Sequence, residues 1–150
     1  MKLISLLEKL EYTCLQGSTD QEVKNVIYDS RKVEEGSLFI CIRGAVVDGH
    51  KFVPDVVAKG AKVLIVEEAV EAPEDVTVIL VKDTRYAMAF ISAAYFGYPA
   101  EKLKTIGITG TKGKTTTTYM VKSILENAGY KVGLIGTIEA IIGDKVIPAK

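Results

Sequence analysis

The chain has 150 residues, which is enough for one ordinary domain or for a small domain with part of a second. It is 48% apolar and 25% charged, a composition typical of a folded globular protein and not of a disordered one. Its 19 basic and 19 acidic residues give a formal net charge of zero, which argues against a protein that binds nucleic acid through bulk electrostatics.

The first residues are predicted to form a short amphipathic helix and not a secretion signal. Leucines at positions 3, 6, 7 and 10 share one helical face, and Glu8 and Glu11 interrupt any apolar core. No stretch of the sequence approaches the roughly 18 uninterrupted apolar residues of a membrane span. We therefore predict a cytoplasmic protein without a membrane partner.

The cysteines and the histidine give no sign of a metal site. Cys14 and Cys41 form no CxxC pair and have no metal-ligand spacing with His50, the only histidine. In a reducing compartment both thiols are expected to be free and buried. His50 is interpreted as a surface or capping residue, Asp48 as a turn or cap, and Arg85 as part of a solvated face.

Four apolar runs that follow the first helix have the length of β-strands. The last two are rich in β-branched residues, which is typical of strands buried on both faces of a sheet. The runs comprise residues 23–31, 36–44, 62–68 and 76–83.

Two helices are predicted among these strands. The first follows Asp48, has Pro54 in its first turn and ends before Gly60. The second begins at a cap formed by Asp83 or Thr84. The residues expected to face the core are Phe52, Val53, Val56 and Val57 in the first helix, and Ala87, Phe90, Ile91, Ala94 and Tyr95 in the second.

Residues 97–104 combine two helix breakers with a charged stretch and are the best candidate for a domain boundary. We therefore divide the chain into residues 1–100 and residues 101–150. The elements predicted for the second part are a strand at 104–109, a helix from about Lys114 to Asn127 stopped by Gly129, a strand at 131–137 and a hairpin that turns at Gly143 and Asp144. Because a strand–helix–strand unit cannot bury its own faces, we expect the chain to be a piece of a longer protein.

A glycine-rich loop joins the predicted strand at 104–109 to the helix. It comprises Gly110, Thr111, Lys112, Gly113, Lys114, Thr115 and Thr116, and the common GxxxxGK[ST] pattern would need a glycine where Ile108 stands. The glycines allow positive φ, so that main-chain N–H groups can surround phosphate oxygens. The helix start adds free N–H groups and the positive end of its dipole. The loop is therefore predicted to bind the phosphates of ATP.

Each side chain of the loop has an expected role. Lys114 is predicted to reach the β- and γ-phosphates as the catalytic cation, and Thr115 to bind Mg²⁺ through its hydroxyl. Thr117 and Thr118 are interpreted as merely tolerated, at a cost of a few tenths of a kcal/mol each. The alternatives are an ordinary strand-to-helix turn and a dinucleotide site, but no GxGxxG can be written here.

With this loop the sequence resembles the Mur ligase family, the ATP-dependent amide-forming synthetases of peptidoglycan precursor assembly. Residues 109–120 look like the family's variant phosphate loop, and residues 131–138 look like the strand after it. Residues 28–68 look like its N-terminal uridine-nucleotide domain. The resemblance implies an α/β fold in which a small UDP-substrate-binding domain precedes the first βαβ part of a P-loop ATPase-type central domain.

The resemblance also implies residues that bind the UDP-muramoyl substrate. Ser30 matches the family serine that contacts this substrate, and Tyr28 stands where a main-chain contact is usual. Residues 45–47 lie where the family touches the uridine nucleotide, although their side chains differ from the usual ones. From the residues alone, the polar run 29–31 reads either as a ligand-holding turn or as a turn capped by its own side chains.

The implied reaction joins a diamino acid, meso-diaminopimelate or L-lysine, to UDP-N-acetylmuramoyl-L-alanyl-D-glutamate through an acyl phosphate, with ATP and Mg²⁺. The acidic metal ligand, the modified lysine and the amino-acid-selecting domain of the family find no match in the chain. We therefore expect the 150-residue chain alone to be inactive. A monomer is the favoured oligomeric state.

Three other functions stay open at this point. One is the Mur ligase that adds D-alanyl-D-alanine, although Gly110 and Thr111 before Lys112 and the run at 133–138 favour the members that add a diamino acid. Another is a folylpolyglutamate synthase, which should lack the part around residues 29–31. The last is a non-catalytic module that senses UDP-sugars or ATP through a partner.

Overall fold

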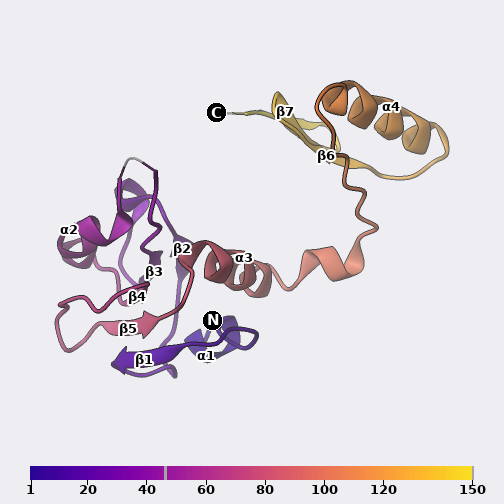
Figure 1. Cartoon of the computed structure of the whole chain (residues 1–150). Coiled ribbons are helices and arrows are strands. Elements are labelled where there is room, and N and C mark those ends of the chain that lie inside the picture. Colours follow the sequence, from indigo (N-terminus) through magenta and orange to yellow (C-terminus); the bar gives the residue numbers. More distant parts are fainter. Residues whose placement is uncertain (46, 150) are drawn as a thin grey trace. The chain divides into compact units, whose positions relative to one another are not determined.

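The computed structural model describes residues 1–45 and 47–149, which form two compact units, Met1–Leu103 and Lys104–Lys150. Figure 1 shows the chain from the N-terminal unit to the C-terminal helix and strands. No helix in the described part of the chain combines the length and the apolar character that crossing a bilayer requires.

The first unit is built on a five-stranded sheet with the order β1-β5-β4-β3-β2. Its strands β2 to β5 run parallel to one another, and β1 pairs antiparallel with β5. The sheet is therefore an α/β sheet with one antiparallel edge strand. The strands are β1 (Thr13–Gln16), β2 (Asn25–Ile27), β3 (Ser37–Ile40), β4 (Val63–Val66) and β5 (Thr77–Leu80).

Helices cover both faces of this sheet. The α-helices are α1 (Leu3–Leu6), α2 (Val53–Ala58) and α3 (Thr84–Tyr95), and the 3₁₀ turns are η1 (Ser30–Lys32), η2 (Gly49–Phe52) and η3 (Pro99–Lys102). The predicted second helix is confirmed with Asp83 as its cap, because the Asp83 carboxylate accepts hydrogen bonds from the amides of Arg85 and Tyr86 in the first turn of α3. The predicted first helix splits into η2 and α2, and Phe52 is 37% exposed, so its expected place in the core is wrong.

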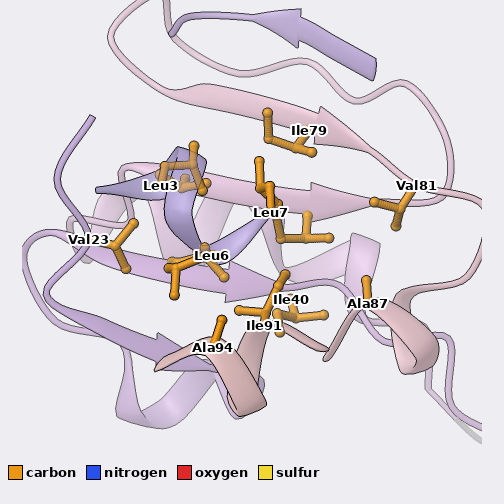
Figure 2. Close-up of a cluster of buried hydrophobic side chains, with 13 residues drawn as sticks. Leu3, Leu6, Leu7, Val23, Ile40, Ile79, Val81, Ala87, Ile91 and Ala94 are labelled. Atoms are coloured by element: carbon orange, nitrogen blue, oxygen red, sulfur yellow. The ribbon is translucent and has the colours of Figure 1, made fainter. Parts of the chain in front are cut away.

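Alternate residues of the central strands enter two separate cores. Leu38 and Ile40 pack with residues of α1 and α3 on one face, whereas Phe39 and Cys41 pack with residues of α2 on the other. Figure 2 shows the first of these cores, in which side chains of α1 and α3 meet the sheet. Its members are Leu3, Leu6, Leu7, Val23, Leu38, Ile40, Val63, Ile65, Ile79, Val81, Ala87, Ile91 and Ala94. The prediction of strands buried on both faces is confirmed.

Strand β1 (Thr13–Gln16) is absent from the predicted elements. Its side chains have the burial pattern of an exposed edge, so the segment lacks the apolar run that signals a buried strand. Cys14 lies on this strand and is exposed, which corrects the expectation that both thiols are buried. Cys41 is buried and free as expected, and burial raises the pKa of its thiol to about 12.

The two thiols should therefore differ in reactivity. A thiol reagent such as iodoacetamide is expected to label Cys14 in the folded protein and to leave Cys41 unmodified until a denaturant exposes it, because thiolate and access are both needed. Peptide mass spectrometry with and without urea measures this. Equal labelling of both cysteines in the folded protein would show that Cys41 is not buried.

The second unit contains α4 (Lys114–Asn127) and a three-stranded antiparallel sheet of β6 (Gly133–Ile135), β7 (Glu139–Ile142) and β8 (Lys145–Pro148). The helix has its predicted bounds, and Gly129 closes it with a φ of 87°. The hairpin also turns where predicted, since Ile142 pairs with Lys145 around Gly143.

Two predictions for this unit are wrong. Residues 104–109 are not a strand, because no segment among the described residues 104–149 offers them a hydrogen-bonded neighbour. The expected strand–helix–strand unit is also not formed, because β6, the strand after α4, pairs antiparallel with β7 of the hairpin. Within residues 104–149 Leu134 alone is buried, so the apolar residues of α4 and of the hairpin have no core of their own to enter.

Candidate functional site

The phosphate loop has the backbone that the sequence predicts at its two glycines. Gly110 has a φ of 152° and Gly113 a φ of 78°, and a Cβ on Gly113 would meet nothing within 4 Å. Gly113 directly precedes α4, so the amides of Lys114, Thr115 and Thr116 stand in the first turn, where an α-helix provides no acceptor. The loop therefore presents open space beside three free N–H groups.

The side chain of Lys114 folds back over this loop. Its ammonium group donates a hydrogen bond to the carbonyl oxygen of Gly110 at 2.6 Å, four residues earlier in the chain. The group is exposed. A phosphate oxygen bound there could replace the carbonyl as its acceptor, with the gain of a charge-assisted hydrogen bond.

The four consecutive threonines divide into two pairs. Thr117 donates its hydroxyl hydrogen to the carbonyl of Gly113 at 2.9 Å, and Thr118 donates to the carbonyl of Thr115 at 2.6 Å. Among residues 1–45 and 47–149, the hydroxyls of Thr115 and Thr116 have no hydrogen-bond partner. The hydroxyls of Thr117 and Thr118 are therefore satisfied within the helix, and those of Thr115 and Thr116 are available to a phosphate or a metal ion.

A second group of polar residues follows the carboxyl end of β2. Tyr28 is 66% exposed, and Ser30 is half-buried at the start of η1. The ammonium group of Lys59 donates to the Ser30 carbonyl oxygen at 3.1 Å and to Asp55 at 2.7 Å. Lys59, which the sequence does not mark, therefore fixes the main chain at Ser30.

The turn at residues 29–31 is capped by its own side chains. The Asp29 carboxylate accepts from the Arg31 amide at 3.1 Å and from the Arg31 guanidinium at 2.9 and 2.8 Å. These hydrogen bonds hold the pKa of the Asp29 carboxyl at about 2. The capped-turn reading is thus correct for Asp29 and Arg31, and it leaves the hydroxyl of Ser30 free of this network.

The predicted surface position of His50 is wrong, because its side chain is only 5% exposed. Its Nδ1 lies 2.6 Å from Asp48 Oδ1, and its Nε2 accepts a hydrogen bond from the Glu67 amide at 2.9 Å. Asp48 caps η2 by accepting from the His50 amide, as predicted. These contacts, the backbone one first, lower the pKa of Asp48 to about 2.

The carboxylate of Glu67 is bound to the start of α3. It accepts from the Thr84 amide at 2.8 Å and from the Thr84 hydroxyl at 2.7 Å. Burial alone would raise the pKa of Glu67, but the hydrogen bonds from Thr84 and the charge of Arg43 outweigh it and lower the pKa. No local sequence signal marks this contact, because Glu67 and Thr84 are brought together only by the sheet.

One cluster in the described part of the chain has the ligand types of a metal site. Ligand atoms of Asp48, His50 and Glu68 lie within 4.8 Å of one another. However, both ring nitrogens of His50 already have hydrogen-bond partners within the chain. Because a metal ion would need one of those lone pairs, the cluster does not fit a metal site as it stands.

Arg85, interpreted as part of a solvated face, is exposed and donates to the carbonyl of Arg43 at 3.4 Å. Of the loop at residues 45–47, which the resemblance connects with the uridine nucleotide, position 46 lies outside the described residues. Val47 is 49% exposed.

Family models match most of the chain. The model described as "Mur ligase family, catalytic domain" matches residues 22–96, and that described as "Mur ligase middle domain" matches residues 108–147. The two matches lie in the same order as the two compact units. The chain belongs to the Mur ligase family.

Individual proteins of the family are also similar to this chain. The chain is 53% identical to the UDP-N-acetylmuramoyl-L-alanyl-D-glutamate--2,6-diaminopimelate ligase of Clostridium perfringens, over 99% of this chain and 31% of that protein. It thus spans about a third of the length of this curated relative.

Solved structures share the fold. A crystal structure of MurF from Acinetobacter baumannii matches 84% of this chain and 27% of its own, with 35% identity and a TM-score of 0.64. MurF from Thermotoga maritima in complex with ADP matches 70% of this chain and 24% of its own, with 26% identity and a TM-score of 0.53.

Proposed function

We propose that this chain supplies the UDP-substrate-binding and phosphate-binding parts of an ATP-dependent ligase. The ligase joins 2,6-diaminopimelate, or another diamino acid, to UDP-N-acetylmuramoyl-L-alanyl-D-glutamate. Residues 1–100 form the UDP-substrate domain in this proposal, and residues 101–150 begin the ATP-binding domain. The observation that carries it is the loop Gly110–Thr116, whose free amides, folded-back lysine and unpartnered hydroxyls suit a triphosphate.

The binding of ATP is supported by the chemistry of the loop. The Lys114 ammonium and the amides of the first turn of α4 would bind the phosphates and stabilise the charge that develops during phosphoryl transfer. The main chain at Gly110, Thr111, Lys112 and Gly113 would lie closest to the phosphates, since glycine admits this approach. A solved relative of the same fold is described in complex with ADP.

Magnesium binding is proposed for Thr115. Its hydroxyl is an oxygen ligand of the type that Mg²⁺ prefers, and it follows directly after the phosphate-binding lysine. The ion would neutralise charge on the phosphates, and Thr116 would donate to them. One side-chain oxygen is a usual protein contribution to such a site, because Mg²⁺ keeps several waters and phosphate ligands.

The UDP-muramoyl substrate is proposed to bind at the carboxyl end of the parallel sheet. In sheets of this kind ligands bind beyond the carboxyl ends of the strands. Ser30 and Tyr28 follow β2 there, and the loop at 45–47 follows the neighbouring strand β3. The hydroxyl of Ser30 and the main chain at Tyr28 are the proposed contacts.

Addition of a diamino acid is preferred to addition of D-alanyl-D-alanine. Identity is 53% to the named diaminopimelate ligase and 35% to the MurF structure from Acinetobacter baumannii. The second reaction remains the alternative because the MurF structure matches 84% of the chain.

The test measures phosphate release by the full-length protein encoded by the gene, with ATP and Mg²⁺. We expect release that requires both UDP-N-acetylmuramoyl-L-alanyl-D-glutamate and a diamino acid, with diaminopimelate and L-lysine compared. Release with UDP-muramoyl tripeptide and D-alanyl-D-alanine would establish the alternative, and no nucleotide-dependent release would refute both. The 150-residue chain alone is expected to release no phosphate.

A further inference from the structure

Hydrogen bonds connect the carboxyl ends of three neighbouring strands in the first unit. After β3, Asp48 and His50 contact each other; after β4, Glu67 contacts His50; and after β5, Thr84 contacts Glu67. Thr84 is fully buried, and the side chains of His50, Glu67 and Asp48 are 5%, 19% and 25% exposed. These hydrogen bonds are thus largely shielded from water, and hydrogen bonds are stronger in such an environment of low dielectric constant.

These contacts determine the tautomer of His50. A backbone amide can only donate, so the Glu67 amide at 2.9 Å requires a lone pair on Nε2. The ring hydrogen is then on Nδ1 and is donated to Asp48 Oδ1 at 2.6 Å. The two ring nitrogens of His50 therefore join Asp48 to the main chain at the carboxyl end of β4.

Asp48 is also the end of a tight loop that starts at Arg43. The loop is closed by a hydrogen bond from the Gly44 amide to the Val47 carbonyl at 3.0 Å and by one from the Gly49 amide to the Ile42 carbonyl at 2.8 Å. A Cβ on Gly49 would lie 2.7 Å from the Ile42 nitrogen, so only glycine permits this closure.

Arg43 adds a charged contact to the same loop. Its guanidinium donates to Asp48 Oδ2 at 3.2 Å and to Glu68 Oε2 at 2.9 Å. Arg43 is half-exposed and Glu68 is 58% exposed, so this contact is solvent-screened and weaker than the buried series through His50.

We infer that His50 is a positioning residue that, through Asp48, holds the two ends of the turn after β3, Arg43 and Asp48, at the edge of the sheet where Ser30 also lies, next to the proposed UDP-substrate site. The neighbouring strands β2 and β3 are paired in parallel, so Ser30 and this loop leave the sheet at the same edge. His50 acts through Asp48 and does not contact the nucleotide. The ligand role of the loop rests on the proposed function, whereas its anchoring by His50 does not.

The anchoring is tested without any ligand in the full-length protein. In His50→Leu, amide exchange at Glu67 is expected to be at least about tenfold faster, since a buried donor loses its acceptor. Backbone order parameters at residues 43–45, 47 and 48 should fall. His50→Gln, whose side-chain oxygen can accept from the Glu67 amide, should restore the slow exchange. Nitrogen chemical shifts of the wild-type ring should show the hydrogen on Nδ1.

The matched control is Thr77→Val. Thr77 is also buried, and its hydroxyl donates to Gln21 at 2.6 Å, but it starts β5 at the opposite end of the sheet. This variant should lower the melting temperature without changing exchange at Glu67. If His50→Leu does not fold, Asp48→Ala removes the partner of Nδ1 at a partly exposed position and should give the same loosening of the loop.

Binding of UDP-N-acetylmuramoyl-L-alanyl-D-glutamate completes the test. Its Kd should rise at least about tenfold in His50→Leu, recover in His50→Gln and stay unchanged in Thr77→Val. Unchanged exchange at Glu67 in the variants, or a ring hydrogen on Nε2, would overturn the anchoring. Faster exchange with an unchanged Kd would overturn the positioning role. If the wild type does not bind the nucleotide, the proposed function fails, and exchange still decides the anchoring.

Discussion

Replacing Lys114 by alanine is expected to lower kcat/KM for ATP by about 10³-fold in the full-length ligase. The ammonium lies 2.6 Å from the Gly110 carbonyl oxygen and is a charged donor at the phosphate loop. Its loss removes the lysine's full positive charge and leaves the proposed Mg²⁺ ion and the backbone amides, which contribute only partial charges, to stabilise the charge that develops on the phosphoryl group. Steady-state phosphate release at varied ATP concentration measures the change.

Two variants separate this role from a general effect of charge. Lys131→Ala removes a positive charge from an exposed position of the same unit and should leave kcat/KM within about twofold of the wild type, since an exposed charge contributes little. Lys114→Arg keeps the charge but replaces a compact ammonium by a planar fork, so activity should be only partly recovered. If Lys114→Ala retained wild-type kcat/KM, the assignment of the phosphate loop would be wrong.

The sequence predicts the local features of the second unit well, where the phosphate loop lies. The bounds of α4, its stop at Gly129 and the hairpin turn at Gly143 follow from nearby residues, because glycine geometry and helix ends are determined over a few positions. The strand expected at 104–109 depends instead on a neighbour far along the chain. The apolar pattern of these residues is typical of a strand, but a strand forms only when its backbone is paired with a neighbour.

The same distinction holds in the first unit. The apolar runs at 62–68 and 76–83 predict strands that are buried on both faces, because each run carries its own apolar signal, whereas the exposed edge strand β1 carries none. The contacts of His50 with Glu67, and of Glu67 with Thr84, join residues 17 positions apart in each case. No periodicity encodes such pairs, so the sequence predicts a surface position for His50, whereas its ring is buried.

The largest loss of stability is expected for Phe39→Ala. Phe39 is 1% exposed on β3, an interior strand, and packs in the core between the sheet and α2 with Val53, Val56 and Leu64. Removing the ring should lower the free energy of unfolding by about 3–5 kcal/mol, because transfer energy is lost and a cavity is left behind. For a domain stabilised by about 5–15 kcal/mol in all, this is a large share.

Cys41 offers a specific measure of that loss. It lies in the same core as Phe39, so the urea dependence of its labelling in a Cys14→Ser background follows unfolding of the first unit alone. Phe39→Leu should cost less because most of the apolar volume is kept. Tyr86→Ala, at a position 57% exposed on α3, should change the free energy of unfolding by less than about 1 kcal/mol. Equal urea midpoints for Phe39→Ala and Tyr86→Ala would contradict the packing of Phe39 in the core between the sheet and α2, because its ring would then contribute no more to stability than an exposed ring.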